Sequence, residues 1–204
     1  MLLPFYKEGM HEAGCDEAGR GCLAGPVVAA AVILPPNFRN LALNDSKKLT
    51  SAKREQLRDV IYDSAISYGI GVVDNEEIDK INILNASIKA MHLALEQLKP
   101  DGFNLILVDG NRFKPYKSID HQCIIKGDGK YMSIAAASIL AKTYRDQLMK
   151  TYSKKYSQYG WDKNAGYPTQ YHRKAIQLHG VTRLHRKSFR LLNDQLDIFT
   201  EIVK

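Results

Sequence analysis

The chain of 204 residues contains only three cysteines and one tryptophan, and it has no long apolar run. Cys15, Cys22 and Cys123 form no C-x-x-C pair, and their odd number favours a reducing compartment over a disulfide framework. None of the six histidines stands at a ligand spacing from a cysteine, so we expect no zinc. No stretch reaches the ~20 apolar residues that span a membrane, and the N-terminal segment lacks the basic start and apolar core of a secretory signal. These absences predict a cytoplasmic protein with no membrane partner.

The bulk composition is that of a globular protein, with 45% hydrophobic and 25% charged residues. With the length, it predicts one domain over residues 1–204, in which residues from about 150 onward form a helical C-terminal extension. The formal net charge is +7 and the pI is near 9.2, which favours an anionic partner such as nucleic acid. We expect the protein to be a monomer.

Short apolar runs alternate with helical spacing early in the chain, and helices dominate later. The predicted strands cover residues 27–34, 70–74, 103–110 and 121–128. Thr50 or Ser51 can cap a helix that follows it. The other predicted helices cover residues 82–99, 132–152 and 170–179, and an amphipathic segment begins at Arg190. The predicted class is α/β with a helical C-terminal part.

Acidic residues lie beside the ends of three of these strands: Asp16 and Glu17 precede the first, Asp109 lies at the end of the third, and Asp128 lies at the end of the fourth, where a helix begins. Carboxylates gathered at one sheet repel one another unless cations lie between them, and oxygen-only ligands select hard ions such as Mg²⁺ or Mn²⁺. Two such ions ~4 Å apart suit the in-line displacement of a phosphoryl group. The set therefore predicts a two-ion phosphoryl-transfer site. Taken singly, each acid is equally a turn residue or a helix cap, Asp128 above all.

Asp16 and Glu17 are adjacent, and neighbouring residues on a regular strand point to opposite faces. Both can serve one site only where the strand is irregular, which Gly14, Gly19 and Gly21 permit. We therefore expect an irregular backbone at this point.

Six sequence blocks follow one another over residues 12–189: CDEAGRGCLAGPVVAAAVIL, NDSKKL, LVDGN, KGDGKYMSIAAASILAKTYRD, NAGYPT and GVTRLHRKSF. In sequence and in order they resemble bacterial type 2 ribonuclease H, ribonuclease HII. The resemblance implies a ribonuclease-H-like fold, with a mixed five-stranded sheet flanked by helices and a helical C-terminal part. It also implies endonucleolytic cleavage of the RNA strand of RNA–DNA hybrids, and nicking 5′ of single ribonucleotides embedded in duplex DNA. The products carry a 3′-hydroxyl and a 5′-phosphate.

The same resemblance implies roles for individual residues. The family's catalytic, metal-binding acids correspond to Asp16, Glu17, Asp109 and Asp128, the set already indicated by the strand ends. The loop whose backbone senses the 2′-hydroxyl, the group that separates RNA from DNA, corresponds to Gly19, Arg20 and Gly21. The tyrosine that stacks on the sugar at the RNA-to-DNA junction corresponds to Tyr167. The positions that touch phosphates correspond to Ser46, Lys47, Ser138 and Lys142.

His172, His185 and Arg186 lie in or beside the C-terminal blocks, and we assign them only backbone or structural roles. Two other interpretations stay open at this point. Another two-metal nuclease of the same fold, such as a junction resolvase, would share the acids but need no 2′-hydroxyl sensor. A non-catalytic nucleic-acid-binding module would keep lysine and arginine but have no use for four acids facing an anionic substrate.

A short segment past the last block, QLDIF, resembles the peptide by which bacterial repair proteins hold the replication sliding clamp, with Ile198 where leucine is usual. Its residues are Gln195, Leu196, Asp197, Ile198 and Phe199. The alternative is a C-terminal helix packed on the domain, because leucine, phenylalanine and valine recur at helical spacing at Leu192, Leu196, Phe199 and Val203. The sequence leaves both interpretations open.

Overall fold

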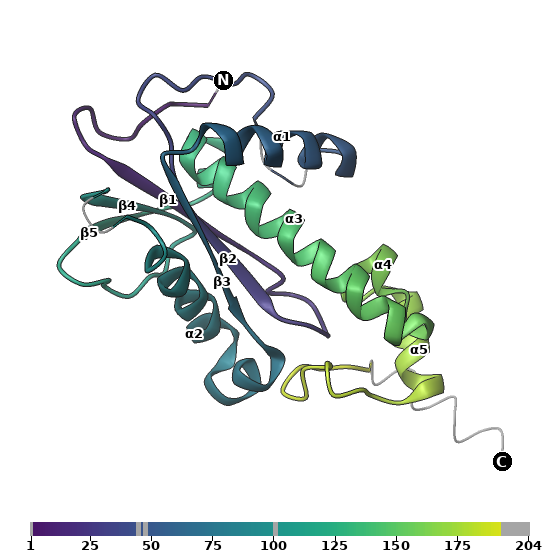
Figure 1. The fold of residues 1–204 in the computed structure, drawn as a ribbon. Coiled ribbons are helices and arrows are strands. Elements are labelled where there is room, and N and C mark those ends of the chain that lie inside the picture. The colour runs from purple at the N-terminus through teal and green to yellow at the C-terminus, as the bar shows by residue number, and fades with distance from the viewer. Residues whose placement is uncertain (1, 44–45, 47–48, 100–101, 193–204) are drawn as a thin grey trace, which may run out of the picture.

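The computed structural model describes residues 2–43, 46, 49–99 and 102–192. Its centre is a five-stranded sheet with the order β3-β2-β1-β4-β5 (Figure 1). The strands are β1 (Glu12–Ala18), β2 (Val27–Ile33), β3 (Ser67–Val73), β4 (Leu105–Asp109) and β5 (Asp120–Ile124). β1, β2 and β3 pair antiparallel, whereas β4 runs parallel to both β1 and β5. The predicted mixed five-stranded sheet is confirmed.

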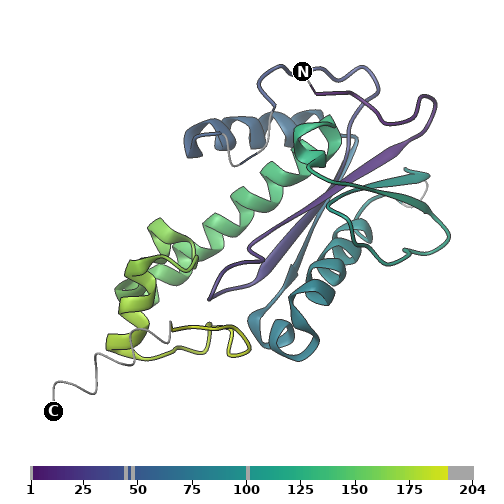
Figure 2. The same ribbon diagram turned by 180° about the vertical axis from the view of Figure 1, so that it is seen from behind.

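Helices cover both faces of the sheet (Figures 1 and 2). One face carries α2 (Asn75–Leu95), and the other carries α1 (Ser51–Ser64) and the long α3 (Met132–Lys155). β2 lies under helices on both faces, and each of its seven residues is buried. A strand covered on both sides reads as a continuous apolar run and not as an alternating one. This burial explains why residues 27–34 stand out in the sequence.

α2 begins earlier than predicted. The sequence indicates a start near Asn82, but the helix begins at Asn75, where the Asp74 side chain accepts a hydrogen bond from the Glu77 amide. Asn82 has a φ of 64° and kinks the helix, and its side chain accepts a bond from the Asn85 amide. Asn82 therefore acts as a second N-cap, which accounts for the helix-start signal in the middle of a longer helix.

The fourth predicted strand ends earlier than expected. β5 stops at Ile124, Lys126 takes a left-handed conformation with a φ of 56°, and Asp128 lies in a 3₁₀ turn, Gly127–Gly129. Asp128 thus sits between β5 and α3 rather than on the strand itself.

The chain after α3 forms short elements: the 3₁₀ turn Ser157–Tyr159, α4 (Trp161–Asn164) and α5 (Gln170–His179). They enclose a small core of their own with the loop after β1, built from Leu23, Ala24, Met149, Tyr159, Trp161, Ala175 and Ile176. Residues 190–192 are not helical, and the rest of the predicted amphipathic segment lies outside the described residues. The single-domain organisation stays a prediction. Among the described helices, none is both long and apolar enough to span a membrane.

Candidate active site

The staggered ends of β1 and β4 create the opening in which the acids lie. β4 pairs with β1 only as far as Cys15 and Val108, whereas β2 pairs with β1 through Ala18. The last residues of β1 therefore have a free edge on the β4 side. Asp109, the final residue of β4, lies at that edge.

The expected irregularity at Asp16 and Glu17 is wrong. Both residues pair in unbroken register with β2, opposite Ala30 and Ala29. Cys15 packs in the core on the α2 side, so alternation places Asp16 on the α3 side and Glu17 on the α2 side. Both side chains nevertheless line one cavity, because the free edge of β1 lets that cavity reach both faces of the strand.

We call this space the acid cavity. It has a volume of about 200 Å³ and is lined by Asp16, Glu17, Ala18, Gly19, Arg20, Gly21, Ser46, Asp109, Ser138, Lys142 and Tyr167. The structure thus brings together three of the four predicted acids and seven of the eight predicted substrate-binding residues. Lys47 lies outside the described residues.

The acids make the cavity electrostatically unfavourable when no cation is present. Asp16 is only 4% exposed, and burial together with repulsion from Glu17 and Asp109 raises the pKa of its carboxyl. A hydrogen bond from Ser138 opposes this rise. The Asp109 carboxylate accepts a bond from the Gly127 amide at 2.7 Å, and Glu17 pairs with Arg20 at 3.1 Å. A bound cation would relieve the repulsion that these contacts leave.

The donor set fits a hard divalent cation, since it consists of carboxylate oxygens. Within the described ranges, no three acidic, histidine or cysteine side chains already enclose a metal position.

Asp128 does not line the acid cavity. It is buried, one residue beyond the Gly127 amide that binds Asp109. It therefore lies in the turn between β5 and α3, next to the residue whose amide binds Asp109.

Two glycines of the predicted sensing loop differ in what surrounds them. Gly19 has a φ of 97°, and a side chain there would overlap Arg145. At Gly21 a Cβ would meet no atom within 4 Å. Packing within the protein thus explains Gly19, whereas the space beside Gly21 is open for a ligand to approach the backbone.

Two buried arginines bind the backbone of the longer loop between β1 and β2, to which these glycines belong. Arg145 donates to the carbonyls of Pro26 at 2.9 Å, Ala165 at 2.8 Å and Ala24 at 3.1 Å. Arg186 donates to the carbonyls of Gly25 at 3.0 Å and Arg20 at 2.9 Å. The structural role predicted for Arg186 is confirmed. Burial lowers its pKa to about 10, which leaves the side chain charged at neutral pH.

Sequence reasoning missed Arg145. One signal for it existed: Ser138, Lys142 and Arg145 are spaced by four and three residues, so they share one face of α3. A buried arginine on the same helix face as two cavity residues could have been expected to reach the neighbouring loops.

Tyr167 closes the cavity from the C-terminal part of the chain. Its side chain is 37% exposed, and its ring centroid lies 5.6 Å from the Lys142 ammonium and 5.9 Å from the Arg145 guanidinium. Lys142 is itself paired with Asp146 at 2.6 Å, and the Ser46 and Ser138 hydroxyls are 2.8 Å apart. A flat aromatic ring, an ammonium and two hydroxyls thus surround the acids.

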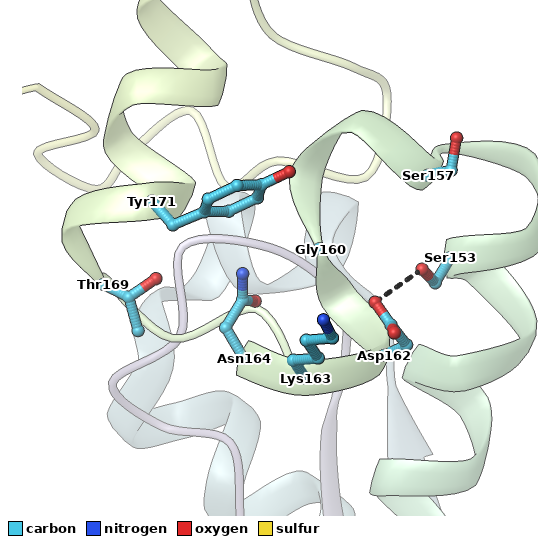
Figure 3. Close-up of a pocket in the computed structure, with 8 residues that line it drawn as sticks. All are labelled: Ser153, Ser157, Gly160, Asp162, Lys163, Asn164, Thr169 and Tyr171. Carbon is cyan, nitrogen blue, oxygen red and sulfur yellow. Dashed lines mark hydrogen bonds between the residues drawn. The ribbon is translucent and has the colours of Figure 1, made fainter.

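A wider hollow of about 690 Å³ is lined by residues of α3, α4 and the segments that follow them (Figure 3). Asn164, Thr169 and Tyr171 line it, and its one carboxylate, Asp162, accepts a bond from Ser153 at 3.2 Å. This hollow contains none of the predicted site residues, so size alone does not locate the chemistry.

Known proteins match this chain along almost its whole length. The family model for ribonuclease HII matches residues 13–192. The chain belongs to the ribonuclease HII family. A ribonuclease HII from Christiangramia forsetii is 62% identical over 197 residues, which cover 97% of this chain and 99% of that protein.

Solved ribonucleases of this kind share the fold. Ribonuclease H2 from Pyrococcus horikoshii OT3 has a TM-score of 0.75 and 27% identity, covering 94% of this chain and all of that one. The ribonuclease HII in a PCNA complex from Archaeoglobus fulgidus has a TM-score of 0.75 and 26% identity, covering 93% of this chain and 100% of that one. As a ribonuclease HII family member, the protein is an endoribonuclease that hydrolyses RNA in RNA–DNA hybrids. Family membership decides against the junction-resolvase and non-catalytic interpretations.

Proposed function

We propose that this endoribonuclease works by two-metal-ion hydrolysis and nicks duplex DNA 5′ of a single embedded ribonucleotide, leaving a 3′-hydroxyl and a 5′-phosphate. One observation carries the proposal. Three of the four acids, Asp16, Glu17 and Asp109, line the same small cavity as the open backbone at Gly21 and the Tyr167 ring. A site that combines phosphoryl-transfer ligands with a close backbone approach can test for a 2′-hydroxyl at the bond that it cuts.

The proposed metal ligands are Asp16, Glu17, Asp109 and Asp128, and the proposed ions are Mg²⁺ or Mn²⁺. When bound, two such ions would activate water and neutralise the leaving oxygen. The raised pKa of Asp16 and its repulsion by Glu17 and Asp109 support this assignment, since divalent cations would remove both. The oxygen-only donor set favours these ions over zinc.

The chain's own residues would position the substrate around the acids. The backbone of Gly19, Arg20 and Gly21 would contact the ribose 2′-hydroxyl, with the open space at Gly21 permitting close approach. Phosphates flanking the cut would contact Ser46, Lys47, Ser138 and Lys142. The exposed part of the Tyr167 ring would stack on the sugar at the RNA-to-DNA junction.

A direct test uses three substrates: a short all-DNA duplex, a short DNA duplex with one ribonucleotide, and a long RNA–DNA hybrid. Each is tested with Mg²⁺ or Mn²⁺ and with EDTA. We expect metal-dependent cuts on the second and third, with the nick 5′ of the single ribonucleotide. A four-way DNA junction serves as the control for a resolvase. Cleavage of that junction, or metal-independent cleavage of the ribonucleotide duplex, would contradict the proposal.

The C-terminal peptide supports one more proposal about partners. Residues 195–199 lie outside the described part of the chain. The Archaeoglobus fulgidus enzyme, a structural neighbour, forms a complex with PCNA. We propose that this peptide binds a sliding clamp, while the protein acts in the cytoplasm as a monomer. Replacing Leu196 and Phe199 together by alanine should weaken binding to a purified clamp and leave cleavage of a short duplex unchanged; loss of folding would instead favour the packed-helix alternative.

A further inference from the structure

A buried polar cluster lies directly behind Tyr167. Trp161 from α4, His172 from α5 and His185 from the loop after α5 are all fully buried. The His172 ring lies 2.9 Å from the Trp161 indole nitrogen, 3.2 Å from the His185 ring and 2.9 Å from the Tyr167 carbonyl oxygen. One imidazole thus joins the C-terminal core to the backbone of a cavity residue.

Each proton in this cluster is determined by its partners. The Trp161 indole can only donate, so Nε2 of His172 accepts from it. The Tyr167 carbonyl can only accept, so Nδ1 of His172 carries a proton and donates to it. Nδ1 of His185 accepts from the Thr182 amide at 2.9 Å, so its Nε2 carries the proton and donates to His172. Nε2 of His172 has one lone pair, which the N–H groups of Trp161 and His185 share. This is the one arrangement of protons in which each contact joins a donor to an acceptor, and both rings are neutral in it.

The arrangement is held in the neutral form by its environment. Burial lowers the pKa of His172, and burial together with His172 lowers that of His185 to about 4. A proton added to Nε2 of His172 would face two N–H groups. The Nδ1–H donor to Tyr167 is therefore a permanent feature of the fold at neutral pH.

The loop that carries Tyr167 has left-handed backbone conformations, so hydrogen bonds to the rest of the protein help to hold it. Ala165 and Gly166 have φ angles of 47° and 81°, in the left-handed region. The Tyr167 carbonyl accepts a second bond, from the Thr169 amide at 2.8 Å, within the same loop. The bond from His172 is the contact at this carbonyl that links the loop to the buried cluster.

We propose that His172 is a positioning residue for the ribonucleotide site. Its Nδ1–H fixes the Tyr167 backbone and so sets where the ring meets the sugar of the substrate. The inference rests on the proposed role of Tyr167. It predicts that losing this one donor changes the preference for a single ribonucleotide over a long hybrid, even when the core is otherwise kept.

Two substitutions separate positioning from core packing. In His172→Asn, the amide nitrogen can take the place of Nδ1 and keep the bond to Tyr167, while the acceptor for Trp161 is lost. In His172→Gln, the longer amide can accept from Trp161 near the place of Nε2, while the donor to Tyr167 is lost. His179→Gln, on the exposed end of the same helix, serves as the control.

The measurement is the ratio of kcat/KM on a single-ribonucleotide duplex to kcat/KM on a long hybrid. It is made at a temperature below the melting temperatures of all the variants. We expect His172→Gln to shift this ratio at least about fivefold, in the direction that Tyr167→Ala shifts it, as one lost hydrogen bond would. His172→Asn should keep the ratio although it melts lower, and His179→Gln should match the wild type. The double variant His172→Gln/Tyr167→Ala should show the ratio of Tyr167→Ala alone. Imidazole ¹⁵N shifts should show His172 protonated on Nδ1 and His185 on Nε2.

The possible failures are distinct. If Tyr167→Ala shifts the ratio and His172→Gln does not, the positioning role is wrong and the proposed function stands. A ratio that follows the melting temperature, with His172→Asn the more affected, would show a purely structural role. If Tyr167→Ala leaves the ratio unchanged, the proposed role of Tyr167 falls, and that of His172 falls with it.

Discussion

The acid cavity and the histidine cluster behind Tyr167 hold polar groups in opposite ways. In the cavity, Asp16 is buried beside Glu17 and Asp109, and repulsion among them raises its pKa. In the cluster, His172 and His185 are buried as neutral rings, and each of their hydrogen bonds joins a donor to an acceptor. The charges of the acid cavity are balanced only when a cation binds. The polar groups of the histidine cluster find their hydrogen-bond partners within the protein. The region whose charges repel one another is therefore the one suited to bind ligands. The region whose polar groups are already hydrogen-bonded is suited to hold the backbone in place.

The largest expected effect comes from removing charge in the cavity. Asp109→Asn and Asp16→Asn should each lower turnover by about a thousandfold, roughly 4 kcal/mol, because a carboxylate proposed to bind metal loses its charge. Binding of the hybrid should remain largely intact, since the phosphate contacts are unchanged. Single-turnover cleavage and a binding titration with Mg²⁺ measure the two effects. Near wild-type cleavage by Asp109→Asn would show that the metal assignment is wrong.

The melting temperature of Asp16→Asn tests the same difference between the acid cavity and the histidine cluster. Because Asp16 is repelled by two neighbours, this variant should melt no lower than the wild type in EDTA. By contrast, His172→Asn, a neutral substitution in the histidine cluster, should lower the melting temperature.

Arg186 is next to His185 in sequence and is hydrogen-bonded to the proposed sensing loop, so it connects the two regions. Arg186→Met would leave the carbonyls of Arg20 and Gly25 without this donor, which we expect to lower the free energy of unfolding by about 3 kcal/mol. Urea unfolding measures the change. Arg20→Ala, which removes an exposed side chain, is the control and should change stability by much less. If Arg186→Met and Arg20→Ala lowered the free energy of unfolding equally, the hydrogen bonds from Arg186 would not be what stabilises the loop.

The two loop glycines offer a smaller effect and a clean contrast. Gly19→Ala should destabilise the protein, because of its positive φ and the overlap with Arg145. Gly21→Ala should leave the melting temperature unchanged and lower ribonucleotide cleavage about 10- to 100-fold, since the methyl group occupies the proposed path of the substrate. A Gly21→Ala enzyme with full activity would remove the argument for close backbone approach there.

The smallest effect is a pH dependence of the histidine cluster. His185 has a pKa lowered from 6.5 to about 4, so the unfolded chain takes up its proton first as pH falls. Its contribution is complete above pH 6.5, and the free energy of unfolding should fall by about 1 kcal/mol per pH unit between pH 6.5 and 4. Denaturation at several pH values measures the slope. His185→Gln should flatten that slope, and an unchanged slope would place the titration elsewhere.

The site residues that could be predicted were those marked by a short sequence pattern. The acids stand beside apolar runs, and those runs form the central strands because both sheet faces are covered. The proposed sensing loop, Tyr167 and the residues proposed to contact phosphates came from ordered sequence blocks, and the cavity contains those of them that the structure describes. The regular register at Asp16 and Glu17 was not predicted, because the free edge of β1 arises from where β4 stops pairing.

The sequence by itself determined the α/β pattern, the chemistry available at the strand ends and the family to which the chain belongs. Those properties follow from residue types and short spacings, which act over a few residues. Only the tertiary structure decided which acids share a cavity, which loop Arg145 supports and which nitrogen of His172 carries the proton. Each of these depends on partners far apart in sequence: Arg145 binds carbonyls at Ala24 and Pro26, 121 and 119 residues away. Hydrogen bonds and charges of this kind exist only once the chain has folded.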